Sequence, residues 1–127
     1  LYTTPQTLAA KVAKAAQNKD YSMEDDVLRL MTSGDYGRYT DRRSKNLQLC
    51  FVTDNDITGG NSGSPMFNGK GELVGLAFDG NWESMANDLQ YSTELTRCIG
   101  VDIRYVMYVI DRWAKADRLM KEISLAR

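Results

Sequence analysis

One short stretch of the sequence carries residue types suited to chemistry at an acyl carbon. It runs Gly59-Gly60-Asn61-Ser62-Gly63-Ser64-Pro65, so that Ser62 lies among three glycines and a proline. Such a segment bends the backbone sharply and leaves amide N–H groups free to stabilise an oxyanion beside an exposed hydroxyl. The same residue types are common in ordinary surface loops between strands, so the segment alone leaves both interpretations open.

The composition lacks the group that most often activates a serine. The chain contains 0 histidines, and a serine hydroxyl is a weak nucleophile at neutral pH without an adjacent base. Either this chain uses another base, such as Lys70 or Lys45, or the base lies on residues outside the chain. Nothing in the sequence positions either lysine, which disfavours a self-contained serine–lysine enzyme.

Length and charge limit the other classes of function. With 127 residues and 43% hydrophobic content, the chain can bury one modest core. Its net charge of −1 gives no indication of a nucleic-acid partner, and no apolar run approaches the roughly 18 residues of a membrane-spanning helix. The start, Leu1 to Pro5, has neither an initiator methionine nor a signal peptide and is typical of the interior of a longer protein.

No metal or cofactor site is expected. Cys50 and Cys98 match no zinc spacing, and either a disulfide or two buried thiols fits them. The acidic segment Asp54–Asp56 begins like a calcium loop, but Pro65 stands where that loop requires a bidentate glutamate.

Hydrophobic spacing predicts helices at both ends of the chain. Thr4 and Pro5 indicate a helix start, and the first helix is expected to run to about Asn18. Ser22 is expected to cap a second helix that stops at Gly34. The strongest helical repeat predicts one long helix from Arg104 to about Ser124.

The central part has the alternation of strands. We expect strands over 47–52, from Met66, over 72–78 and over 98–103, with a tight hairpin at Asn68–Gly71 and a loop over 83–96. Gly75 interrupts one strand, which indicates space beside a ligand. Tyr36 and Tyr39 are expected to anchor a polar loop by their rings.

Three blocks of the sequence resemble one enzyme family. Asp56–Pro65, Gly75–Glu83 and Val101–Val106 are similar, in order and spacing, to the C-terminal part of the bacterial dipeptidyl-peptidase 7 and 11 family of chymotrypsin-fold serine peptidases. The resemblance implies an α+β fragment: the last strands of a chymotrypsin-like (trypsin-like) β-barrel with short N-terminal helices and a long C-terminal helix.

On this resemblance, residues 1–127 are the C-terminal part of one catalytic domain. Helices and a loop take 1–46, half-barrel strands with the nucleophile loop take 47–103, and the C-terminal helix takes 104–127. In chymotrypsin-like peptidases the histidine and aspartate of the triad precede the serine. We therefore expect both on an upstream part of the same protein, and we expect the isolated chain to be inactive and to fold poorly.

The resemblance also implies roles for four residues. Ser62 would be the nucleophile, and the backbone N–H groups of Gly60 and Ser62 would form the oxyanion hole. Asp79 would hold the α-amino group of the substrate, although an aspartate before a glycine is also a common turn residue. Gly80 would line the S1 pocket, where the acid-cleaving branch carries an arginine, which implies an apolar or aromatic side chain before the cut.

The function implied is a serine-type dipeptidyl aminopeptidase, closer to the dipeptidyl-peptidase 7 branch, that releases dipeptides from free N-termini of peptides. The resemblance further implies a homodimer and a periplasmic, cell-surface or secreted location, without nucleic acid, membrane insertion or cofactor. The alternative is a non-catalytic chymotrypsin-like domain with a binding or structural role.

Overall fold

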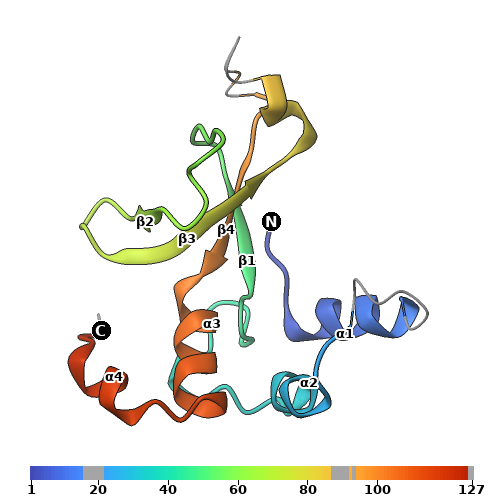
Figure 1. Ribbon diagram of the computed structural model, residues 1–127, viewed down its shortest axis with the longest axis vertical. Coiled ribbons are helices and arrows are strands. Elements are labelled where there is room, and N and C mark those ends of the chain that lie inside the picture. The colour runs from blue at the N-terminus through green and yellow to red at the C-terminus, as the bar shows by residue number, and fades with distance from the viewer. Residues whose placement is uncertain (16–21, 87–91, 93, 126–127) are drawn as a thin grey trace.

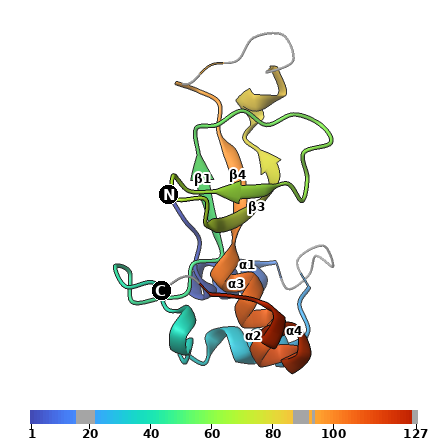
Figure 2. The same ribbon diagram turned by 90° about the vertical axis from the view of Figure 1, so that its left-hand side faces the viewer.

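A four-stranded sheet at one end and a group of helices at the other make up the molecule (Figures 1 and 2). The computed structural model describes residues 1–15, 22–86, 92 and 94–125. The α+β class expected from the sequence is confirmed. None of the helices in these ranges is long and apolar enough to cross a membrane.

The sheet is antiparallel and has the order β1-β4-β3-β2. Its strands are β1 (Cys50–Thr53), β2 (Pro65–Phe67), β3 (Leu73–Gly80) and β4 (Cys98–Asp102). Cys50 lies opposite Val101, and Cys98 lies opposite Thr53. The two cysteines are therefore three ladder positions apart, too far for a disulfide, and both are free thiols.

The strand predictions hold best at the hairpin. The segment Asn68–Gly71 turns between β2 and β3, with the Gly71 N–H bonded to the Asn68 carbonyl at 3.0 Å and Gly71 at φ +75°. The first strand begins three residues later than expected. Leu47 and Leu49 are buried, 0% and 4% exposed, but they precede the ladder. Leu49 still bonds to both neighbouring segments, through its N–H to the Thr3 carbonyl at 2.9 Å and through its carbonyl to the Asp102 N–H at 2.8 Å.

The interpretation of Gly75 as a place for a ligand is wrong. A Cβ atom on Gly75 would lie 2.6 Å from the Val101 carbonyl oxygen and 2.7 Å from the Phe51 ring. The space is already filled by the neighbouring strands. This glycine is needed for the close approach of the β4 backbone and of the Phe51 ring to β3.

The N-terminal helices begin with different kinds of cap. Helix α1 (Pro5–Lys14) starts as expected, since the Thr4 hydroxyl accepts the Thr7 N–H and the Thr7 side chain accepts the Thr4 N–H. It ends at Lys14, and the part of the prediction over 16–18 lies outside the described residues. Helix α2 (Asp25–Thr32) has Glu24 at its N-cap without a side-chain bond, so the Ser22 cap is wrong.

The long C-terminal helix is also wrong. Helix α3 (Ile103–Tyr108) passes into a π-helical turn, η4 (Val109–Trp113), and the chain then bends before α4 (Asp117–Glu122). Lys115 has φ +50° at the bend, a left-handed conformation that ends an α-helix. The apolar repeat continues across the bend, and so it resembled one helix.

The main core lies between the helices and the lower end of the sheet. Tyr36 precedes a 3₁₀ turn, η2 (Gly37–Tyr39), and Tyr39 is its last residue. Both rings pack edge-on against Tyr108, with ring centroids 5.8 and 6.0 Å apart. Their predicted anchoring role is confirmed by exposures of 4% and 3%. The buried members of this cluster are Met31, Tyr36, Tyr39, Leu47, Leu49, Met107 and Tyr108.

Candidate active site

The loop that carries Ser62 is held as a compact double turn. Gly60 and Gly63 adopt φ +91° and +87°, conformations that glycine reaches without a steric penalty. Asn61 ties the loop together: its Oδ1 accepts the Thr58 N–H at 2.9 Å, and its carbonyl accepts the Ser64 N–H at 2.9 Å. The order of glycines and Asn61 therefore fixes the shape of the loop.

Two backbone hydrogen bonds attach this loop to β3. The Gly63 N–H donates to the Ala77 carbonyl at 2.7 Å, and the Ala77 N–H donates to the Ser64 carbonyl at 2.9 Å. Ser62 is exposed, and its hydroxyl lies 3.4 Å from the Phe78 carbonyl oxygen. Among the described residues, no acceptor pairs with the amide N–H groups of Gly60 and Ser62. An exposed hydroxyl and two available donors thus share one rigid loop.

A β-bulge lies where β3 passes this loop. Ala77 pairs with Gly100 but Asp79 pairs with Ile99, so Phe78 is the extra residue on β3. A bulge reverses the alternation of side chains and is common beside functional sites. Beyond it, the Asp79 carboxylate is exposed and accepts the Gly80 N–H at 2.8 Å.

Ser62, Asp79 and Gly80 line one hollow of about 230 Å³. The structure therefore brings together three of the four site residues expected from the sequence, and the fourth, Gly60, lies on the same loop. The remaining lining residues are Ile57, Thr58, Gly59, Phe78, Ser84 and Met85. Among the described residues that line this hollow, Asp79 has the one ionisable side chain, so the hollow is suited to a cationic group beside the serine.

Ser84 and Met85 are lining residues that the sequence did not predict. They belong to a 3₁₀ helix, η3 (Trp82–Ala86), in a segment expected to be a loop; the part of that expectation over 87–91 and 93 lies outside the described residues. The Asn81 carbonyl accepts both the N–H and the hydroxyl of Ser84, at 3.0 and 2.6 Å. The signal available in the sequence was the three-residue spacing of Asn81 and Ser84, which suits a tight turn.

No base for Ser62 is found within the described chain. Histidine is absent from the sequence, and neither Lys70 nor Lys45 lines the hollow at Ser62. Lys70 lies in the β2–β3 turn, and Lys45 lies in the loop before β1 with φ +55°. Across the residues that the structure describes, no group of three metal-ligating side chains could hold a metal ion.

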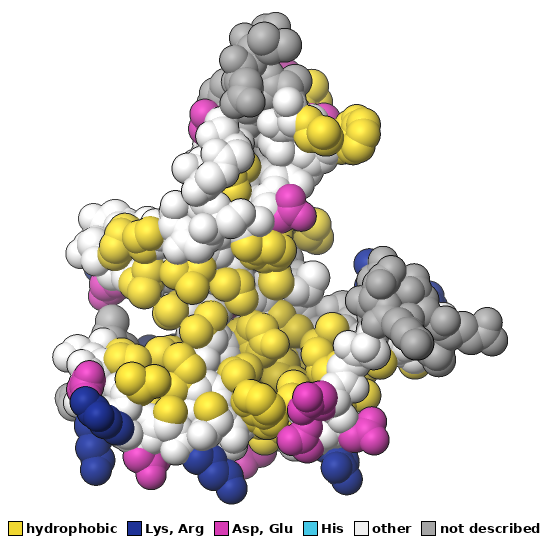
Figure 3. All heavy atoms as spheres, viewed as in Figure 1, with side chains coloured by type: hydrophobic (Ala, Val, Ile, Leu, Met, Phe, Trp, Pro, Cys, Tyr) yellow, Lys and Arg dark blue, Asp and Glu magenta, His cyan; other side chains and the backbone are white. Residues whose placement is uncertain are grey.

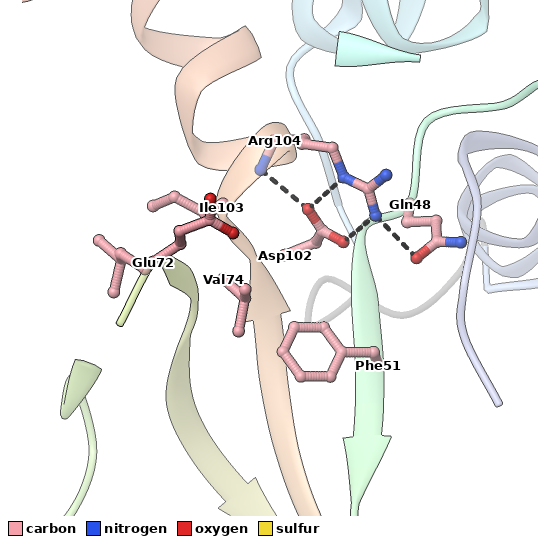
Figure 4. Close-up of a pocket in the computed structure, with 8 residues that line it drawn as sticks. Gln48, Phe51, Glu72, Val74, Asp102, Ile103 and Arg104 are labelled. Atoms are coloured by element: carbon pink, nitrogen blue, oxygen red, sulfur yellow. Dashed lines mark hydrogen bonds and ion pairs between the residues drawn. The ribbon is translucent and has the colours of Figure 1, made fainter. Parts of the chain in front are cut away.

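A second hollow, of about 370 Å³, lies beside the junction of β4 and α3 (Figure 4). Its guanidinium, on Arg104, has three partners: it donates to Asp102 at 2.7 Å, to Asp41 at 2.7 Å and to Gln48 at 3.0 Å. The bond to Asp102 raises the pKa of Arg104. The backbone N–H of Ser44, and then Arg104, hold the pKa of Asp41 well below its usual range.

This network is structural. Arg104 connects the loop at Asp41, the segment before β1 and the end of β4, and Asp102 also caps α3 by accepting the Arg104 N–H. Glu72, on the opposite wall, accepts the Asn68 side-chain N–H at 2.6 Å. Asp102 and Arg104, on one wall of this larger hollow, are thus paired with each other, in contrast to Asp79 beside Ser62.

Comparison with known proteins gives one consistent result. The model of the peptidase S46 family matches residues 1–125. The chain is 49% identical over 126 residues to dipeptidyl-peptidase 7 of Porphyromonas endodontalis, covering 99% of this chain and 15% of that protein. It is 46% identical over 98 residues to an Asp/Glu-specific dipeptidyl-peptidase of Capnocytophaga gingivalis, covering 77% of this chain and 14% of that protein.

The fold is also that of a solved relative. Porphyromonas endodontalis DPP11 in complex with the dipeptide Arg-Glu matches with a TM-score of 0.80 and 36% identity, over 89% of this chain and 16% of that one. The chain thus spans about 15% of the length of the curated relatives it matches.

Proposed function

We propose, since this chain belongs to the peptidase S46 family, that the whole protein is a serine-type dipeptidyl aminopeptidase. The observation that carries the proposal is the placement of Ser62 and Asp79 around one hollow. A nucleophile and an anion that line the same hollow suit the removal of a short unit from a free N-terminus. The names of the relatives agree with this reaction.

Ser62 is the proposed nucleophile. Its hydroxyl attacks the peptide carbonyl and gives its proton to a histidine on the upstream chain, which later protonates the leaving amine. The N–H groups of Gly60 and Ser62 then receive the oxyanion, each worth about 3 kcal/mol in the transition state. Ser64 has a structural part, since its N–H and carbonyl bond to Asn61 and Ala77.

Asp79 is the proposed partner of the substrate's α-ammonium group. The carboxylate is exposed within the described residues, and one oxygen is fixed by the Gly80 N–H. A peptide with an acetylated N-terminus cannot bind there in the same way, because an acetylated amine carries no charge. Binding the terminus sets how many residues reach Ser62, which defines a dipeptide product.

An apolar or aromatic residue before the cut is proposed from the lining of the hollow. Ile57 and Met85 contribute apolar surface, and no lysine or arginine is among the lining residues. The comparisons do not support this preference, since Asp/Glu-specific relatives and a DPP11 complex with Arg-Glu match as well and point to an acidic residue. The apolar preference therefore rests on Gly80 and the lining alone.

The remaining proposals concern the whole protein. We propose that residues 47–103 belong to a chymotrypsin-like barrel completed by the upstream chain. The support is the four-stranded antiparallel sheet, whose β2 forms an outer strand. Residues 1–3 already pair with the other outer strand, through Thr3 N–H to Cys50 carbonyl at 2.9 Å. From the family resemblance alone we propose a homodimer in the periplasm or at the cell surface.

The test uses the full-length protein and peptides that differ only at the N-terminus. A peptide with a free amine should lose its first two residues, as detected by mass spectrometry, and its N-acetylated form should stay intact. A second pair, with Leu or Asp at the second position, should show the higher kcat/KM for Leu. Faster cleavage of the Asp peptide would replace the apolar preference by an acidic one.

If neither of the peptides with a free N-terminal amine is cleaved, the alternative of a non-catalytic domain is favoured. The isolated 127-residue chain is the matched control, because it has no imidazole to accept the Ser62 proton. Ser62-dependent dipeptide release by this chain would contradict the proposed upstream base.

A further inference from the structure

Gly80 is a glycine because of its surroundings rather than its backbone. Five glycines of the described chain have positive φ, and Gly80 is not one of them. Its backbone is therefore open to any L-residue. What excludes a side chain is space: a Cβ on Gly80 would overlap the Ser84 hydroxyl, and it would lie 2.9 Å from Ser84 Cβ and 3.2 Å from Ile57 Cγ2.

Ser84 cannot move aside freely. Its hydroxyl and its N–H both donate to the Asn81 carbonyl, at 2.6 and 3.0 Å. Asn81 is itself fixed between two segments, since its Oδ1 accepts the Arg97 N–H at 2.8 Å and its Nδ2 donates to the Leu95 carbonyl at 2.7 Å. The wall formed by η3 is thus attached to the chain that leads into β4.

We infer that Ser84 is a specificity-determining residue, because its hydroxymethyl group fills the wall of the hollow at the point where a side chain on residue 80 would begin. Residues 80 and 84 form one size-complementary pair. The smallest residue at 80 is matched by a small, hydrogen-bonded residue at 84. A larger residue at 80 enters the hollow only after residue 84 is reduced. This inference rests on the proposed function, since it assigns a role within the same substrate hollow.

Two consequences follow for substrates. Removing the Ser84 side chain widens the hollow on the η3 side and favours larger side chains before the cut. A guanidinium introduced by Gly80→Arg reaches the hollow efficiently only when Ser84 is also reduced. Because one methylene in a pocket changes kcat/KM by roughly tenfold or more, both effects are measurable.

The experiment places Gly80→Ala in three backgrounds of the full-length protein: unchanged, Ser84→Ala and Ser84→Gly. With a Leu dipeptidyl substrate, Gly80→Ala should lower kcat/KM roughly tenfold in the unchanged background. The loss should be smaller with Ser84→Ala and below about threefold with Ser84→Gly. An equal loss in all three backgrounds would overturn the pairing of residues 80 and 84.

A single substitution keeps the inference testable if Gly80→Ala does not fold. Ser84→Gly alone should raise the ratio of kcat/KM for Phe over Leu substrates by roughly threefold or more, with Ser84→Ala between. Thermal unfolding and labelling of Ser62 by a small phosphonofluoridate check folding. Since a merely structural role for Ser84 would lower both substrates together, an unchanged Phe-to-Leu ratio would overturn the inference.

The arginine series gives the second readout. Gly80→Arg should raise the Asp-to-Leu ratio more in the Ser84→Gly background than in the unchanged one, and an equal rise in both would contradict the inference. An inactive unmodified full-length protein would instead reject the proposed function. If the unmodified full-length protein is active but the effects of the substitutions at 80 and 84 on kcat/KM simply add, only the role of Ser84 is rejected.

Discussion

The helical end of the molecule and the sheet end that carries Ser62 are packed in different ways. At the helical end, Met31, Leu47 and Tyr108 are each 0% exposed. At the sheet end the buried cluster is small, formed by Ile57, Ala77 and Cys98, while Trp82 and Met85 are 81% and 72% exposed. Figure 3 shows hydrophobic side chains gathered over the lower half and a separate exposed group at the upper end.

The two ends also differ in how their charges are paired. Arg104 at the helical end has two carboxylate partners, Asp41 and Asp102. Asp79 at the sheet end forms no ion pair within the described residues, and its carboxylate accepts the N–H of Gly80. The unfolding free energy therefore depends mainly on the helical end, while the sheet end keeps the Asp79 carboxylate available for a ligand. Substitutions at the helical end should therefore lower stability, and substitutions at the sheet end should lower the reaction rate.

The largest effect is expected at Ser62. In the full-length protein, Ser62→Ala should lower kcat by up to about a millionfold, because only oxyanion stabilisation and binding remain. Thermal unfolding should be unchanged, since the hydroxyl is exposed and its one contact is 3.4 Å long. Ser64→Ala is the matched control and should retain much of the activity. A dead Ser64→Ala with an active Ser62→Ala would assign the nucleophile two residues later.

Asp79→Asn should have the next largest effect. Loss of one charge-assisted hydrogen bond to the substrate ammonium should lower kcat/KM about 10- to 100-fold. Leu and Asp substrates should suffer alike, because both carry the same terminal amine. The measurement is kcat/KM for the two substrates at fixed ionic strength. A loss confined to one substrate would place Asp79 in side-chain selection rather than amine binding.

A substitution in the main core should lower stability and leave kcat/KM nearly unchanged. Met31→Ala removes a buried side chain beneath Tyr36 and Tyr108 and should lower the unfolding free energy by about 2–5 kcal/mol. At a temperature where the variant is still folded, kcat/KM should stay within about twofold, as the site lies at the other end. Leu119→Ala, at a position that is 50% exposed on α4, is the control and should change stability little. A large kcat/KM loss in Met31→Ala would show that the two ends are coupled.

The smallest effect concerns pH and Asp41. The folded protein holds the pKa of Asp41 below its usual range, through the Ser44 N–H and then Arg104. The ionised group therefore stabilises the fold above the ordinary aspartate pKa of about 4, and this contribution is lost as pH falls through the lower folded pKa. Asp41→Asn should thus lower the unfolding temperature at pH 7, and its difference from the unmodified protein should shrink below about pH 4.

Glu122→Gln is the control for this experiment. It breaks an exposed pair with Arg118 at 3.3 Å, and exposed pairs contribute little. A pH-independent difference for Asp41→Asn would attribute the effect to geometry rather than to ionisation.

Residue types that lie close together in the sequence made much of the sheet end predictable. The positive φ angles of Gly60 and Gly63 and the turn at Asn68–Gly71 follow from residue types within a few positions. The same is true of the Thr4 cap. Ser62 and Asp79 come together because the β2–β3 hairpin returns beside the loop that precedes it.

Features that depend on tertiary packing were not predictable in this way. The bend at Lys115 interrupts an apolar repeat that continues on both sides. The need for glycine at position 75 comes from Phe51 and Val101, which are distant in sequence. The wall at Ser84 depends on Asn81 bonding to Arg97, which lies 16 positions later in the sequence. A periodic pattern records burial but not which neighbour occupies the space.

The strand order β1-β4-β3-β2 has a consequence for the order in which the site forms during synthesis. The serine loop needs only β2 and β3, so it can close as soon as residue 80 has left the ribosome. The wall at Ser84 needs Arg97, and β3 gains its second neighbour only with β4, so both wait for the last quarter of the chain. Because distant pairing is slow compared with hairpin closure, the nucleophile is shaped before the pocket that selects its substrate.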